Sequence, residues 1–267
     1  MRYLAPSFDG INLEDISAPR CFEIEDALQD LEIPVFHDDQ HGTAVVLLAA
    51  LTNALKVVDK RIETIRVAFS GAGAAAMACA KLVVACGATN VTLVDSQGII
   101  HREREGLTPV KEAALSFTNP DELRGGMSEA MAGADVFVGL SRAGVIDEGM
   151  VAEMADRPIV FAMANSEPEI MPEKAYAAGA ALVSTGRSDL PNQVNNSLGF
   201  PGIFRGALDA RATSITHSMK IAASEALAAL VKHPTVDRIL PDTLDPAVVP
   251  AVSRATHDAW IAETRSS

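Results

Sequence analysis

The sequence predicts an α/β fold: a doubly wound parallel sheet with an N-terminal arm and a set of C-terminal helices. Short apolar segments of strand length alternate with helical segments from residue 65 to residue 186. That alternation is typical of an open parallel sheet covered by helices on both faces. Hydrophobic residues make up 48% of the chain and aromatic residues only 4%, so the core must be aliphatic, as suits strands that are buried on both sides.

The elements can be assigned in order along the chain. Residues 1–32 are irregular except for a short helical pattern from Cys21 to Leu31. Strands are expected at residues 33–36, 65–69, 90–94, 136–138, 159–161 and 181–183. Helices are expected at residues 42–58, 74–86, 147–154, 172–178, 203–211, 218–232 and 246–262. The segment from residue 65 to residue 94 is a βαβ unit, whose helix ends at Gly87.

The overall charge excludes some classes of partner. The formal net charge is -13, and a surface this acidic repels phosphate backbones and anionic lipid, so we expect neither nucleic acid nor membrane as a partner. The three cysteines have no paired spacing, which favours a reducing compartment. The N-terminus lacks the apolar segment of a signal peptide. A cytoplasmic protein is the expectation.

A glycine-rich turn lies between the first strand and the helix of the βαβ unit. The segment Gly71-Ala72-Gly73-Ala74-Ala75-Ala76 fits the pattern G-x-G-x-x-A. Gly71 allows the tight turn, Gly73 lets backbone approach a pyrophosphate, and the small Ala76 lets helix and strand pack closely. The N-terminus of the helix then faces the phosphates. The alternative is a turn that serves packing alone.

The next strand ends in Asp95, about twenty residues beyond the turn, where a carboxylate binds the ribose 2′-hydroxyl of a dinucleotide. Together, the turn and Asp95 predict a Rossmann-type NAD(P)-binding domain. Asp95 would repel a 2′-phosphate, which favours NAD over NADP. Arg102 and Arg104 in the following loop leave NADP open, and a solvated Asp95 is the remaining alternative.

Two acidic pairs follow short apolar segments. Glu14-Asp15 follows residues 10–13, and Asp38-Asp39 follows residues 34–37. If the apolar residues are buried, the carboxylates lie at the edge of the core and need a partner. Oxygen ligands converging on one point suit Mg²⁺ or Mn²⁺. Two solvated loop pairs are the alternative, because no short metal-binding motif is present. We interpret the flanking His37 and His41 as supporting or surface residues.

Two adjacent amides lie in the loop after the last strand. Asn195 and Asn196 occupy the end of the sheet where doubly wound folds bind ligands, and amides can orient a carboxylate without adding charge. A turn held by asparagine hydrogen bonds is the alternative.

Four segments taken together resemble the malic enzymes, most of all the short bacterial type. They are G-I-N-L-E-D-I at residues 10–16, P-V-F-H-D-D-Q-H-G-T-A at 34–44, S-G-A-G-A-A-A at 70–76 and N-N-S-L-G-F-P-G-I-F-R-G at 195–206. The likeness runs in order from about residue 8 to about residue 262. Four motifs in the right order are far more specific than any one of them.

The resemblance implies a role for each of these residues. Glu14, Asp15 and Asp39 would bind Mg²⁺ or Mn²⁺, with Asp38 beside them at the catalytic centre. Asn196 would contact the malate carboxylate, with Asn195 nearby. Asn165, in F-A-M-A-N-S-E-P-E, matches a family segment at the ribose and nicotinamide of the cofactor, although Ser166 stands where the family has proline.

The implied reaction is the oxidative decarboxylation of malate. A hydride passes from C2 of malate to NAD or NADP, and the cation stabilises the charge that develops as CO₂ leaves. Proton transfers then give pyruvate. In the family, a lysine and a tyrosine from a preceding domain make these transfers. Only nine residues precede Gly10, and Tyr3 is the one tyrosine among them.

Three segments are therefore expected: an N-terminal segment of residues 1–40 with the metal ligands, an NAD(P)-binding domain of residues 41–211, and C-terminal helices of residues 212–267 packed on that domain. The chain is expected to be a truncated enzyme, one half of a split enzyme, or a catalytically silent dinucleotide-binding fragment. A different small-acid dehydrogenase fits less well, since it would not need the carboxylate pairs. A homodimer, or a complementing N-terminal domain, is the expected partner besides malate and pyruvate.

Overall fold

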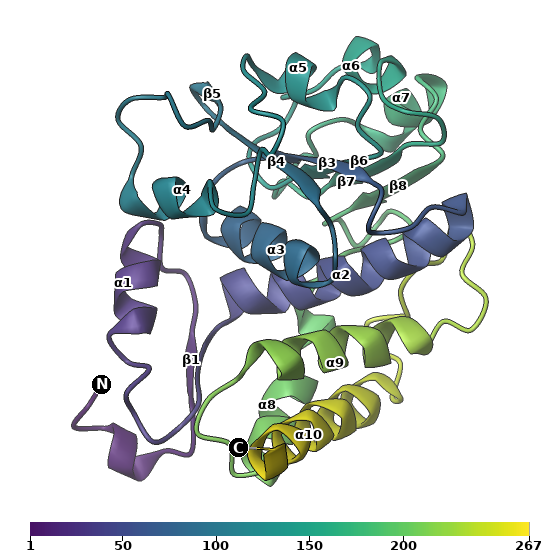
Figure 1. Ribbon diagram of the computed structural model, residues 1–267. Coiled ribbons are helices and arrows are strands. Elements are labelled where there is room, and N and C mark those ends of the chain that lie inside the picture. The colour runs from purple at the N-terminus through teal and green to yellow at the C-terminus, as the bar shows by residue number, and fades with distance from the viewer. Residues whose placement is uncertain (267) are drawn as a thin grey trace.

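A six-stranded sheet forms the centre of the computed structural model, which describes residues 1–266 (Figure 1). The strand order is β5-β4-β3-β6-β7-β8. The parallel strands are β3 (Arg66–Ser70), β4 (Asn90–Asp95), β6 (Val136–Gly139), β7 (Ile159–Ala162) and β8 (Leu182–Thr185), and β5 (Gly98–Ile99) is antiparallel to β4. The chain runs from β3 to β4 and then returns to β6 on the other side of β3. The carboxyl ends of β3 and β6 are therefore a switch point, where such sheets bind ligands.

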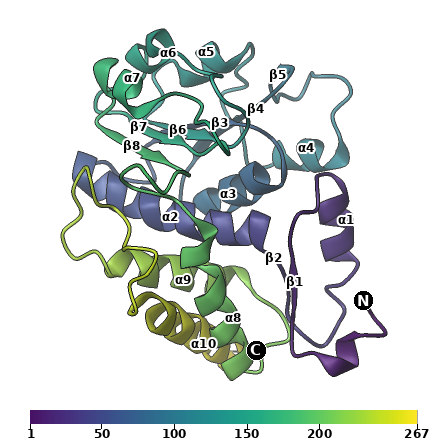
Figure 2. The same cartoon turned by 180° about the vertical axis from the view of Figure 1, so that it is seen from behind.

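Helices cover both faces of the sheet, which confirms the doubly wound fold (Figures 1 and 2). Successive strand residues point to opposite faces. Val67 and Phe69 belong to one buried cluster with helices α2 and α3, whereas Ala68 belongs to a second cluster on the other face. The covering helices are α2 (Asp38–Val58) and α3 (Ala74–Ala85) on the first face, and α5 (Met127–Met131), α6 (Glu148–Ala152) and α7 (Pro172–Ala177) on the second.

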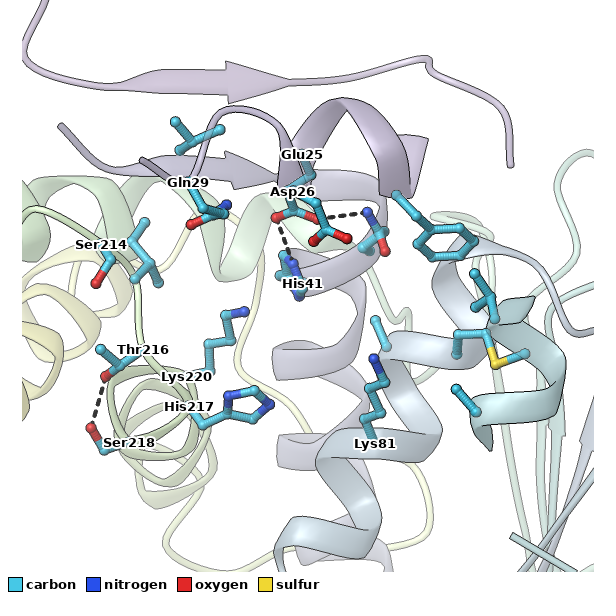
Figure 3. A pocket seen from close by; sticks show the side chains of 18 of the residues that line it. Glu25, Asp26, Gln29, His41, Lys81, Ser214, Thr216, His217, Ser218 and Lys220 are labelled. Carbon is cyan, nitrogen blue, oxygen red and sulfur yellow. Dashed lines mark hydrogen bonds and ion pairs between the residues drawn. The ribbon is translucent and has the colours of Figure 1, made fainter. Parts of the chain in front are cut away.

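The N-terminal arm is tied to the start of α2. Strands β1 (Ile11–Leu13) and β2 (Val35–His37) pair in parallel, and β1 was not predicted because three residues are too few to show a period. Glu25 of helix α1 (Arg20–Asp26) accepts hydrogen bonds from Gln40 Nε2 at 2.9 Å and from His41 Nε2 at 2.8 Å (Figure 3). These bonds fix α1 against the first turns of α2.

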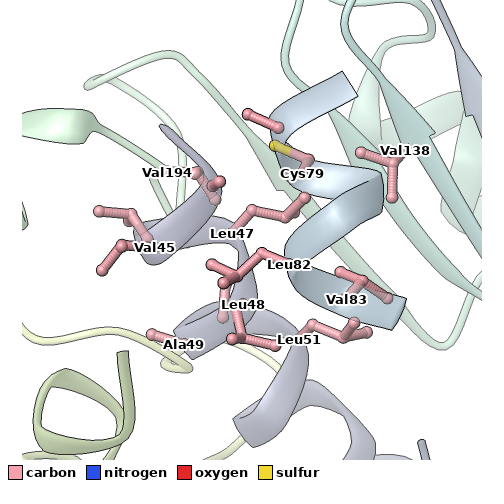
Figure 4. Packing of buried hydrophobic residues seen from close by; sticks show 14 of the residues in the cluster. Val45, Leu47, Leu48, Ala49, Leu51, Cys79, Leu82, Val83, Val138 and Val194 are labelled. Atoms are coloured by element: carbon pink, nitrogen blue, oxygen red, sulfur yellow. The ribbon is translucent and has the colours of Figure 1, made fainter. Parts of the chain in front are cut away.

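Helix α2 is the central element of the core. Leu47, Leu48 and Leu51 pack against Leu82 and Val83 of α3 (Figure 4). Among the described helices, α2 is the one that is long and apolar enough to cross a membrane, but most of it is buried inside the protein. It begins four residues earlier than the sequence predicts, at Asp38. A carboxylate is favoured in this first turn because the helix dipole is positive there.

The C-terminal helices cover the far side of α2. Helix α9 (His217–Ala229) packs on α2, and it is covered in turn by α10 (Val248–Ser266), which also packs on α8 (Phe200–Asp209). Asn53 of α2 is fully buried, and its Nδ2 donates to the carbonyl oxygens of Ala228 and Ile239 at 2.9 Å each. The C-terminal part is thereby fastened to the core helix. The short α4 (Pro109–Ala114) lies beside α1.

Helix α9 buries a lysine. Lys220 is only 8% exposed, and its Nζ lies 6.0 Å from the centre of the Phe36 ring. Burial lowers the pKa of Lys220 from 10.5 to about 8, and Lys81 lowers it further, against the opposing effect of Glu25. Because the folded chain holds this proton less tightly than the unfolded chain, the charged lysine destabilises the fold below pH 8.

We therefore expect Lys220→Met to raise the free energy of unfolding at pH 7, by up to roughly 3 kcal/mol. The gain should shrink as the pH rises from 8 toward 10.5, where the lysine of the unfolded wild-type chain also loses its proton. Denaturant titrations of both proteins at pH 7 and pH 9.5 measure the difference. An equal gain at the two pH values would contradict the assignment of this cost to the buried charge.

Candidate functional site

A crevice of about 600 Å³ lies at the switch point of the sheet. Its lining includes the Gly71–Gly73 turn after β3, Asp95 at the end of β4, and Leu140 and Ser141 after β6. These segments come from three neighbouring parallel strands, whose carboxyl ends meet at one edge. The structure thus brings together the glycine turn and Asp95 as the sequence predicts.

The two glycines of the turn have different surroundings. Gly71 has φ +114°, and an added Cβ would lie 2.7 Å from the Leu140 carbonyl oxygen, so the turn requires glycine there. Nothing lies within 4 Å of a Cβ built on Gly73, which has a φ of -87°. Gly73 therefore leaves open space above the start of α3. Ala76 is 1% exposed and packs in the core beneath the turn.

Asp95 is engaged by two cations. Its carboxylate accepts hydrogen bonds from Arg104 Nη2 at 2.6 and 2.7 Å and from Lys111 Nζ at 2.6 Å. Burial would raise the pKa of Asp95, but the bonds from Lys111, the Gln97 N–H and Arg104 hold it below its usual value. Sequence reasoning considered Arg104 and missed Lys111, because nothing in the sequence places α4 beside the end of β4.

A buried glutamate holds the edge of the crevice in place. Glu169 is 0% exposed, and it accepts hydrogen bonds from the backbone N–H of Ser141 at 3.1 Å and of Ala164 at 3.0 Å. It therefore links the loops that follow β6 and β7. Burial raises the pKa of Glu169. Glu169 was not among the predicted site residues. Its position in the loop after a strand is the one feature of the sequence that could have indicated it.

Asn165, which the resemblance assigns to the cofactor, is exposed in the loop after β7. The next residue, Ser166, has φ +69°. Proline is fixed near -65°, so the proline that is usual in the family could not adopt this backbone conformation. The backbone at this position therefore suits serine and excludes proline.

The second site is a group of carboxylates at the start of α2. Asp38 Oδ2 accepts a hydrogen bond from Asn196 Nδ2 at 2.6 Å, and Asp39 Oδ2 accepts one from the backbone N–H of Asp15 at 2.8 Å. Glu14 Oε1 accepts one from Asn12 Nδ2 at 2.6 Å. Residues from β1, α2 and the segment after β8 thus meet here, although Asp38 and Asn196 are 158 positions apart in the sequence.

Asp38 is the buried member of this group, at 3% exposed. Burial, together with the charges of Glu14 and Asp39, raises the pKa of Asp38 from 3.8 to about 7, against the opposing bond from Asn196. Its Oδ1 is buried and has no hydrogen-bond partner among the described residues. A Cβ on Gly42 would lie 1.8 Å from this oxygen. Glycine inside a helix is costly, and here it makes room for the carboxylate.

These residues fit a divalent cation by their chemistry. The donors are carboxylate and amide oxygens, which Mg²⁺ and Mn²⁺ prefer, and the unpartnered Asp38 Oδ1 lies within a concentration of negative charge. Within residues 1–266, however, no three His, Cys, Asp or Glu side chains are arranged so as to hold a metal ion. Asp39 instead accepts from the backbone of Asp15, and Glu14 from Asn12.

The two asparagines have separate roles. Asn196 contacts Asp38, whereas the side chain of Asn195 accepts from the Ser197 N–H at 2.9 Å and caps the short 3₁₀ helix Asn196–Leu198. For Asn195 the structure thus shows the alternative interpretation of the sequence, a turn held by asparagine hydrogen bonds. Neither flanking histidine is a surface residue. His37 is fully buried, and its ring nitrogens lack partners in the described part of the chain; His41 bonds Glu25.

Comparison with known proteins agrees with this geometry. A family model described as the NAD-binding domain of malic enzyme matches residues 40–251. The chain is 52% identical over 97% of its length to the NAD-dependent malic enzyme of Geobacillus stearothermophilus and 48% identical over 97% to an NADP-dependent malic enzyme of Rhizobium meliloti. It spans 55% and 36% of these two relatives.

A solved structure resembles the fold nearly throughout. The malic enzyme of Pyrococcus horikoshii superimposes with a TM-score of 0.95 at 46% identity, over 98% of this chain and 63% of that one. The match covers the arm, the sheet and the C-terminal helices alike. The family match extends over well more than half of the sequence, and the fold and the four motifs agree with it: the chain belongs to the malic enzyme family, of which it contains the NAD-binding domain.

Proposed function

We propose that this chain binds NAD or NADP and a divalent cation, and provides that part of an oxidative decarboxylation of malate to pyruvate and CO₂. The observation that carries the proposal is the contact between Asn196 and Asp38 beside Glu14 and Asp39. An amide donor next to several carboxylates is suited to a cation and an anionic substrate together. The crevice at the switch point supports the proposal that the chain binds a dinucleotide.

The surroundings of Asp95 leave both dinucleotides acceptable. A free carboxylate would repel a 2′-phosphate, but Arg104 and Lys111 offset its charge. Lys111 also lines the crevice, so a cation lies where a 2′-phosphate would need one. The preference for NAD that Asp95 alone suggests is therefore weakened.

Glu14, Asp15 and Asp39 are the proposed ligands of Mg²⁺ or Mn²⁺, with Asp38 next to them. When bound, the cation would supply Lewis-acid stabilisation of the charge that develops on the substrate as CO₂ leaves. Asn196 orients the substrate carboxylate, and Asp38 holds the Asn196 amide through its Oδ2. Asn195 fixes the turn that carries Asn196.

The proton transfers have no candidate in the described part of the chain. No lysine or tyrosine within residues 1–266 forms a hydrogen bond or ion pair with the carboxylates of the second site. Tyr3 is fully exposed on the arm, and Tyr176 packs against β8, where its OH accepts from the Val183 N–H. The alternative is therefore a dinucleotide-binding fragment without turnover, or one half of a split enzyme that a second domain or chain completes.

Dinucleotide binding tests the crevice directly. We expect Gly73→Ala to weaken binding of both NAD⁺ and NADP⁺ by at least about tenfold, because the added methyl group occupies the approach of the pyrophosphate. The variant should melt at the wild-type temperature, since nothing in the fold lies near the new Cβ. Calorimetric titration and thermal melting measure the two effects. Unchanged affinity in a folded variant would exclude the turn as the phosphate site.

Cation binding tests the carboxylate group. Asp39→Asn should weaken Mn²⁺ binding by at least about tenfold, since ligand charge sets the affinity of oxygen sites. Asp59→Asn, at the exposed far end of the same helix, is the matched control and should bind like the wild type. Electron paramagnetic resonance of free Mn²⁺ gives both affinities. Equal Mn²⁺ affinity in Asp39→Asn and Asp59→Asn would contradict the assignment of Asp39 as a metal ligand.

A turnover assay distinguishes an enzyme from a dinucleotide-binding fragment without activity. With malate, Mn²⁺ and either dinucleotide, we expect the isolated chain to form no NADH or NADPH, because no lysine or tyrosine within residues 1–266 contacts the carboxylates of the site. Adding a separately expressed N-terminal domain from a malic enzyme should restore the absorbance change at 340 nm if the chain is one half of an enzyme. Steady malate-dependent reduction by the chain alone would contradict the expectation.

A further inference from the structure

A second cavity, of about 760 Å³, lies between α1, α3, α4 and the start of α9. It shares no lining residue with the crevice at the switch point. Figure 3 shows that Lys81, His217 and Lys220 surround its central space. The proposed reaction uses none of these three side chains, so the cavity requires its own explanation.

Lys220 has no hydrogen bond or ion pair in the part of the chain that the structure describes, although more than nine tenths of it is buried. Its ammonium lines the cavity beside the Phe36 ring. Lys81, from α3, lines the opposite wall and likewise has neither kind of partner among residues 1–266. Lys81 lowers the pKa of Lys220. A buried ammonium without a directly bound anion is costly unless a ligand supplies that anion.

Two of the three acidic residues of the cavity, Glu25 and Glu263, already have partners. Glu25 is held by Gln40 and His41, and Glu263 accepts hydrogen bonds from the hydroxyls of Thr216 and Ser218 at 2.8 and 2.6 Å. Asp26 is exposed at the rim. Lys220 is therefore not neutralised by a direct contact with any of them. The 13-residue helix α9 begins at the same wall, and its positive end adds to the attraction for an anion.

Part of the lining is apolar. Phe22, Met77, Val110 and Ile215 contribute from four different segments. A volume of this size is in the range of cavities that hold small organic ligands, which combine an apolar lining with a few placed polar groups. Inorganic anions alone would leave this apolar part unused.

We propose that the cavity binds a small organic anion, whose phosphate or carboxylate lies between Lys220 and Lys81 at the start of α9 and whose apolar part packs against Phe22, Met77 and Val110. This site is independent of the dinucleotide crevice and of the proposed reaction. The buried lysine is the specific feature, because a shallow surface site would leave its charged group in water.

Titration calorimetry with phenyl phosphate and with phenylacetate tests the proposal on the whole chain, and benzyl alcohol serves as the neutral probe. At least one anion should bind, and Lys220→Met should weaken it by at least about tenfold. Lys81→Met, which changes an exposed side chain and should leave the fold intact, should also weaken it. Lys232→Met, on the exposed surface beyond α9, should bind like the wild type.

Four results would overturn the proposal. One is an absence of binding by both anions, and another is unchanged affinity in both Lys220→Met and Lys81→Met. The third is a loss of phenyl phosphate binding in Lys111→Met while Lys220→Met keeps it, because the anion would then occupy the dinucleotide crevice. Binding of benzyl alcohol as tightly as the anions would likewise show an apolar cavity without a site for charge.

Discussion

The burial of α2 is the constraint on which the rest of the structure depends. Its sides pack on α3 under the sheet and on α9 beneath the C-terminal helices, so it joins the two halves of the core. Removing this much aliphatic surface from water is the dominant favourable contribution to folding. The same burial determines where the first turn of the helix lies, and that turn carries Asp38 and Asp39.

A largely buried helix thus carries a destabilising group in its first turn. Carboxylates at close range repel each other, and Asp38 is kept almost out of water. Three features offset this cost: the positive end of the helix dipole, the hydrogen bond from Asn196, and the space above Gly42. The bonds from Glu25 to Gln40 and His41 secure the same turn from the arm. Asp38 and Asp39 are in this way held at one end of the core helix.

The five parallel strands and the helices α2, α3 and α6 to α10 were predictable, because alternating apolar strands and helical segments depend on local periodicity. The glycine turn and Asp95 were predictable for the same reason, since one βαβ unit positions both. The two-residue β5 and the short helices α4 and α5 were not predicted. The partners of Asp95 were only partly predictable: Lys111 comes from α4, and no local pattern places that helix. Asp38 and Asn196 are 158 positions apart, and the resemblance pointed to both. Glu169, which acts through backbone N–H groups, left no signal in spacing or charge.

Lys111 stands outside the βαβ unit that makes the turn, and it reaches Asp95 from a short helix with a partly exposed side chain. An exchange at this position would change the charge beside Asp95 without altering the turn, the sheet or the packing of α3. If the crevice holds the dinucleotide as proposed, a substitution of Lys111 would shift the preference between NAD and NADP and leave the core unchanged.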